Sequence, residues 1–171
     1  MSKLSTKEKE AISVFIDYIN MDTPFLEMKK EHYHNLPQHF ANLPESVFCK
    51  KVPKHLYHFG VEKRGSVYTE SGVLSCTTTK GKHYIKANWR FDDGDFLFKI
   101  SPVSPNSPVV DVRKLCKVVG KNSCLKEEHF DKIEYVEDRV RKEKEYIMLL
   151  GGVYSEKLEK WNVSSHSWVK L

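Results

Sequence analysis

Two glutamates, Glu143 and Glu145, stand at alternate positions directly before the apolar stretch YIMLLGG. If this stretch is a β-strand, alternate side chains face the same side, so both carboxylates would point into one cleft. Like charges this close resist full ionisation unless cations or hydrogen bonds compensate them. The alternative is that Glu143 belongs to the solvated run EDRVRKEKE and that Glu145 merely ends it.

A pair of hydroxyl side chains lies in the stretch SGVLSCTTTK, residues 71–80. Ser75 and Thr77 occupy alternate positions and would therefore share one face of a strand. Hydroxyl groups both donate and accept hydrogen bonds, so they can bridge a carboxylate and a ligand ribose. The alternative is a strand that is simply rich in threonine, a residue that favours strands.

The third candidate is the stretch HLYHFG, residues 55–60. His58 can donate a hydrogen bond to a ribose hydroxyl or a phosphate, and Gly60 can let the backbone approach a ligand closely. The alternative is a histidine with a purely structural role.

The elements that must position these residues begin with a helix over residues 5–20. Ser5 is followed three residues later by Glu8, a capping-box pattern, and apolar residues then recur at helical spacing, namely Ile12, Phe15, Ile16 and Ile19. Four prolines divide residues 23–54 into short pieces. We therefore expect a helical N-terminal region over residues 1–52.

Short runs rich in β-branched and aromatic residues follow Pro53 and predict strands: HLYHFG, GVLSCTTT, DFLFKISPV, PVVDVRKL and EYIMLLGGVY. Residues 80–94 predict one short helix that contains Tyr84 and ends in an Asp-Asp-Gly turn. This order predicts an α+β fold with a mixed or largely antiparallel sheet. No glycine pattern of a dinucleotide-binding or phosphate-binding loop is present, which disfavours a Rossmann domain.

Composition limits the classes of protein that remain. The 171 residues are 40% apolar and carry a formal charge of +5, which predicts one mildly basic domain over residues 1–171. No run approaches the roughly 18 apolar residues of a membrane span, so we expect a cytoplasmic protein without a membrane partner. The four cysteines lack CxxC spacing and the histidines lack ligand spacing, so we expect free thiols and no metal site.

The order of the three polar stretches resembles the mono-ADP-ribosyltransferases. An apolar-Tyr-basic-x-Gly strand near residue 56 precedes a Ser-x-hydroxyl strand, and a Glu-x-Glu strand runs into apolar residues near the end. The chain looks most like the arginine-directed branch, which includes bacterial toxins and the Mod and Alt enzymes of T-even bacteriophages. The resemblance covers residues 53–153 and implies an ADP-ribosyltransferase-like core over residues 53–171, preceded by a helical segment.

The resemblance also implies roles for single residues. Glu145 matches the glutamate that holds the 2′-hydroxyl of the nicotinamide ribose of NAD and stabilises the cation formed as nicotinamide leaves. Glu143 matches the glutamate that orients and deprotonates the acceptor. Ser75 and Thr77 match the family's Ser-x-Ser motif, and Tyr84 would supply an aromatic face for nicotinamide.

One position departs from the branch that the chain resembles most. The arginine-directed enzymes carry arginine in the first strand, where it grips the NAD phosphates, and this chain has His58 there. The resemblance predicts NAD as the substrate and a protein acceptor, typically arginine, in the host cytoplasm if a phage encodes the chain. Two alternatives remain, namely ADP-ribosylation of nucleic acid and a non-catalytic binding protein or inhibitor with the same fold.

Overall fold

The N-terminal helix is capped as the sequence predicts. The structure is a computed structural model that describes residues 3–19, 35–78, 91–129 and 144–171, and its helix α1 spans Thr6–Ile19. The Ser5 hydroxyl accepts a hydrogen bond from the Glu8 backbone N–H over 3.1 Å, and the Glu8 carboxylate accepts one from the Ser5 N–H over 2.9 Å. This reciprocal pair is a capping box, which confirms the predicted start of the helix.

Two short elements follow in the proline-punctuated region, in agreement with its predicted division into pieces. Helix α3 spans Leu36–Ala41, with Pro37 in its first turn, and the 3₁₀ helix η2 spans Glu45–Val47. Phe40 of α3 packs edge-to-face against Phe15 of α1, with ring centroids 6.1 Å apart. Aromatic packing of this kind fixes the short helix on the long one.

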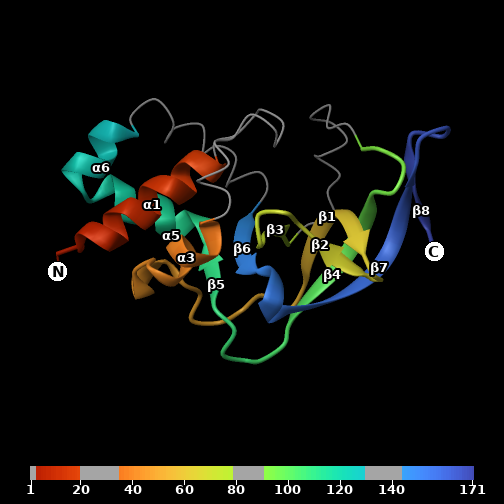
Figure 1. Ribbon diagram of the computed structural model, residues 1–171, viewed down its shortest axis with the longest axis horizontal. Coiled ribbons are helices and arrows are strands. Elements are labelled where there is room, and N and C mark those ends of the chain that lie inside the picture. The colour runs from red at the N-terminus through yellow and green to blue at the C-terminus, as the bar shows by residue number, and fades with distance from the viewer. Residues whose placement is uncertain (1–2, 20–34, 79–90, 130–143) are drawn as a thin grey trace.

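The described strands form one eight-stranded sheet (Figure 1). The strands are β1 Leu56–Lys63, β2 Ser66–Tyr68, β3 Val73–Thr77, β4 Phe96–Pro102, β5 Val109–Asp111, β6 Glu145–Leu149, β7 Val153–Asn162 and β8 Ser167–Lys170. Their order is β5-β6-β3-β1-β4-β7-β8, β2 pairs with β1, and the pairings between these strands are antiparallel. The α+β class predicted from the sequence is confirmed.

The predicted strand PVVDVRKL is wrong in its second half. Strand β5 ends at Asp111, and helix α5 begins at once and spans Val112–Gly120. The Asp111 side chain accepts a hydrogen bond from the Arg113 N–H over 2.9 Å, so the aspartate caps the helix. A further helix, α6, spans Ser123–Glu128. The predicted order of elements lacked both helices.

The predicted strand EYIMLLGGVY is interrupted. The 3₁₀ helix η3, Leu150–Gly152, separates β6 from β7. Strands β2, β7 and β8 extend the sheet beyond the predicted set. The Asp-Asp-Gly turn before β4 is present, with Gly94 at φ +94°, whereas the predicted helix around Tyr84 lies outside the described residues.

Two apolar cores flank the sheet. The first lies between the helices and one face of β5, β6 and β3, on the left of Figure 1. Its strand residues are Val73, Val110 and Ile147, and its helical residues come from α1, α3, α5 and α6. The second core lies on the opposite face and contains Leu56, Leu74, Phe98, Tyr146 and Met148. Alternation along each strand therefore assigns every site residue to one face or the other.

No helix among the described residues is both long and apolar enough to cross a membrane. None of the four cysteines forms a disulfide, and Cys76 and Cys116 are buried.

Candidate functional site

Strands β3 and β6 bring a carboxylate and two hydroxyl groups together. Thr77 is the register partner of Glu145, and residues directly opposite each other share a face of the sheet. Ser75 lies two residues earlier on β3 and therefore on that same face. The Ser75 hydroxyl donates a hydrogen bond to Glu145 Oε1 over 2.5 Å. Ser75, Thr77 and Glu145, which the sequence singled out, thus lie together on neighbouring strands. The hydrogen-bonded pair Ser75–Glu145 is 70 positions apart in the chain.

Glu145 is held inside the protein, with 3% of its surface exposed. A buried carboxylate is costly unless hydrogen bonds compensate the loss of water, and Ser75 supplies one of them. The carboxylate also affects Cys76 on the other face of β3. Burial is the main cause that raises the pKa of the Cys76 thiol, and the negative charge of Glu145 is the second. Ser75 therefore fixes the orientation of the Glu145 carboxylate.

His58 reaches the same part of the sheet through its ring. Its Nδ1 lies 2.8 Å from the Ser75 carbonyl oxygen, and a carbonyl can only accept, so Nδ1 carries the proton. Burial lowers the pKa of His58, and the hydrogen bond to Ser75 offsets part of that effect. The ring is therefore neutral at pH 7, and its Nε2 is an acceptor. The prediction that His58 donates to a ligand is corrected, because its proton is already used by Ser75.

Gly60 makes room for that ring. A Cβ atom added at residue 60 would lie 2.7 Å from His58 Nε2, closer than such atoms approach in real structures. The ring also lies beside Phe98, with centroids 6.5 Å apart. The sequence predicted that Gly60 lets the backbone approach a ligand. In the structure the absence of a side chain at Gly60 leaves space for the imidazole of His58.

These residues lie around the junction of β1 and β3, which we call the seam and define by the pair Tyr57–Thr77 together with His58, Ser75 and Glu145. Within the described residues β1 and β3 share this single register pair. Because Tyr57 shares a face with Thr77, the Cα–Cβ bond of His58 points to the opposite face. The seam thus has Glu145 and the hydroxyl groups on one face and His58 on the other, linked through the Ser75 backbone.

Two of the predicted site residues, Glu143 and Tyr84, lie outside the described residues. Strand β6 begins at Glu145, and Lys144 before it has φ +48°, a left-handed backbone conformation that is uncommon for a residue other than glycine.

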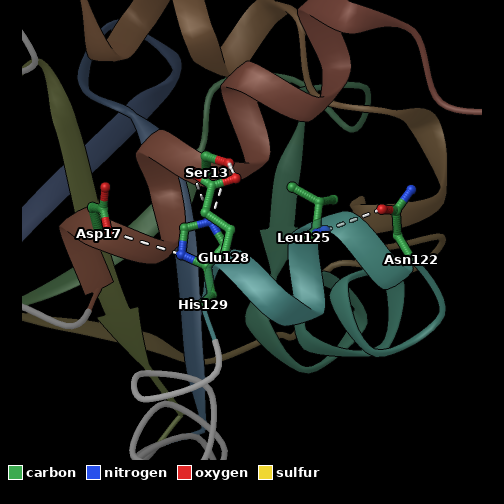
Figure 2. A network of polar contacts seen from close by, with 6 residues as sticks. All are labelled: Ser13, Asp17, Asn122, Leu125, Glu128 and His129. Atoms are coloured by element: carbon green, nitrogen blue, oxygen red, sulfur yellow. Dashed lines mark hydrogen bonds and ion pairs between the residues drawn. The ribbon is translucent and has the colours of Figure 1, made fainter.

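A second polar cluster joins α1 to the end of α6, and the sequence gave no sign of it (Figure 2). His129 Nε2 lies 3.0 Å from the Ser13 hydroxyl, 116 positions away, and His129 Nδ1 lies 4.0 Å from an Asp17 oxygen. Serine, histidine and aspartate form hydrolytic triads, but there the acid is hydrogen-bonded to the ring, and 4.0 Å is too long for that. The Ser13 hydroxyl also donates to Glu128 over 3.3 Å, and His129 is 1% exposed. We interpret the cluster as a joint between helices.

The described residues hold no group of three or more histidine, cysteine or acidic side chains placed to bind a metal ion. Comparison of the chain with protein-family models, curated proteins and solved structures finds no match. The seam and the sequence motifs are therefore the features that bear on function.

Proposed function

We propose that the protein is a mono-ADP-ribosyltransferase that transfers ADP-ribose from NAD to a protein side chain, arginine by its resemblance to the arginine-directed branch. One observation carries the proposal: the Glu145 carboxylate is buried and is hydrogen-bonded by Ser75, beside Thr77. Glu145 of the Glu-x-Glu motif accepts a hydrogen bond from Ser75 of the Ser-x-hydroxyl motif and is in register with Thr77 of the same motif.

The chemistry needs a fixed negative charge. When the bond between ribose C1′ and the nicotinamide nitrogen breaks, both electrons leave with nicotinamide and the sugar becomes an oxocarbenium-like cation. A preplaced carboxylate stabilises that cation most where the charge develops, and its burial strengthens the interaction. In this proposal Glu145 accepts a hydrogen bond from the ribose 2′-hydroxyl and faces C1′, while Ser75 holds the carboxylate in place.

The acceptor completes the reaction. A guanidinium nitrogen of arginine attacks C1′ and loses one proton, so the products are ADP-ribosyl-arginine, nicotinamide and a proton. By the resemblance, Glu143 takes that proton and orients the acceptor.

Labelled NAD tests the proposal directly. Incubation of the protein with adenylate-labelled NAD and a cell lysate should label one or more protein bands, and Glu145→Ala should reduce the signal by about 100-fold or more, the usual effect of losing an electrostatic group at a transition state. Glu70→Ala, which removes an exposed carboxylate, is the matched control and should leave labelling unchanged. Absence of both labelling and NAD binding by calorimetry would reject the proposal. Protease or nuclease sensitivity of the product identifies the acceptor as protein or nucleic acid.

A second candidate function is a binding protein without catalytic activity. It is favoured by the neutral ring of His58, because this position in β1 then carries no positive charge for the NAD phosphates. A binding protein of this kind would show no NAD turnover, and the Glu143→Ala, Glu145→Ala double variant would retain its partner.

A further inference from the structure

One row of polar side chains crosses the sheet on the face that carries Glu145. The register pairs Glu145–Thr77, Thr77–Tyr57, Tyr57–Lys99 and Lys99–Glu156 follow each other over β6, β3, β1, β4 and β7. Directly opposed residues share a face, so all five side chains emerge on the same side of the sheet. The row continues the candidate site from Glu145 across the seam.

Lys99 is the cation of this row. It is half-buried, and among the described residues it forms no ion pair, although Glu156 is its direct neighbour on β7. By contrast, Lys157 on the opposite face of β7 pairs with Glu62 over 2.7 Å. A half-buried lysine that forms no ion pair keeps its charge available and favours an anionic ligand at that point of the sheet.

The spacing fits a ligand that extends from Glu145. Neighbouring strands lie about 4.8 Å apart, so three steps along the row place the Lys99 backbone about 14 Å from that of Glu145, and the lysine stem extends further. In a dinucleotide the diphosphate is joined to the reacting ribose through its C5′ atom. The row thus presents a carboxylate for the ribose and, farther along, a cation for the anionic linker.

The seam itself supplies no such cation. The imidazole of His58 donates to Ser75 and stands on the other face, and the arginine that the resemblance would place in β1 is absent. We propose that Lys99 binds the diphosphate of NAD and takes the role that arginine in the first strand has in the enzymes that the chain resembles. This inference rests on the proposed function, because it assumes that NAD occupies the row.

Binding measurements on full-length variants test the inference. Lys99→Gln should weaken NAD and ADP-ribose at least tenfold in calorimetry, since a charge-assisted contact with phosphate is lost. Nicotinamide riboside lacks the diphosphate, so its affinity should not change. Lys99→Arg keeps the charge and should keep most of the affinity. Lys160→Gln is the matched control, since it removes an exposed lysine of the same sheet. Its register partner Phe96 lies on the face of β4 opposite to Lys99.

The possible outcomes separate the two proposals. If wild-type protein binds NAD and Lys99→Gln binds it equally well, the role of Lys99 is overturned while the transferase proposal stands. If Lys99→Gln weakens nicotinamide riboside as much as NAD, the substitution has disturbed the sheet, and the phosphate contact is overturned as well. If the wild type binds neither NAD nor ADP-ribose, the proposed function fails first and the inference fails with it.

Discussion

Removal of the Ser75 hydroxyl tests the contact on which the site depends. Hydrogen bonds to charged groups contribute about 1.5–3 kcal/mol to stability and neutral ones about 1 kcal/mol. Glu145 is 3% exposed, so water replaces the lost donor poorly. We therefore expect Ser75→Ala to lower the free energy of unfolding by about 1.5–3 kcal/mol, as measured by urea denaturation at pH 7.5.

A double-mutant cycle assigns that loss to the Ser75–Glu145 pair. Glu145→Gln leaves a neutral acceptor at the same place, so Ser75→Ala should cost only about 1 kcal/mol in that background. Ser155→Ala is the matched control. The Ser155 hydroxyl accepts a neutral hydrogen bond from the Val67 N–H over 3.0 Å, and its removal should cost the same in both backgrounds.

Activity gives an independent reading of the same contact. Each 1.36 kcal/mol lost from transition-state stabilisation is a factor of ten in rate, so Ser75→Ala should lower kcat/KM by about 10- to 100-fold. Ser155→Ala should leave kcat/KM unchanged. Equal stability losses for Ser75→Ala in the wild-type and Glu145→Gln backgrounds would refute the reasoning, because the serine would then not be holding a charged carboxylate.

Two further predictions concern the other face of the seam. The folded-state pKa of His58 lies below its ordinary value of 6.5, so the neutral ring contributes its full stability above pH 6.5 and this contribution is lost as the pH falls through the lowered pKa. The free energy of unfolding, measured by urea denaturation, should therefore decrease less between pH 7.5 and pH 5 for His58→Gln than for the wild type. Gly60→Ala should lower the free energy of unfolding by about 1–3 kcal/mol, because the new Cβ displaces the ring from Ser75. Gly120→Ala, which meets nothing within 4 Å, should not destabilise the protein, and equal melting temperatures for both variants would contradict the proposed crowding.

Local patterns predicted the elements whose signals lie within a few residues. The capping box at Ser5 and the apolar spacing after it were sufficient for α1. Helix α5 was missed because Val109, Val110 and Val112 read as one β-branched run. The Asp111 cap followed by buried residues at helical spacing was the available signal. Strand β7 was missed because its polar sequence, VYSEKLEKWN, lacks the apolar alternation of a half-buried strand.

The site could be predicted only as a set of separate stretches. Residue types and spacing singled out His58, Ser75 and Glu145, but the strand order that makes β3 the neighbour of both β1 and β6 depends on long-range pairing. Register in turn placed His58 and Glu145 on opposite faces and brought Lys99 into the row, and no local pattern encodes either result. Lys99 carried no signal in the sequence, where it is one lysine in an apolar strand.

Among the residues that the structure describes, one register pair joins β1 to β3, and this pair divides the sheet into two halves. One half carries Glu145 and the helices that pack on β6, and the other carries Lys99. A molecule that contacts both residues crosses the seam and bridges the two halves. Separation of the halves must then break the bridge as well, so binding in the row would also stabilise the half that carries the helices.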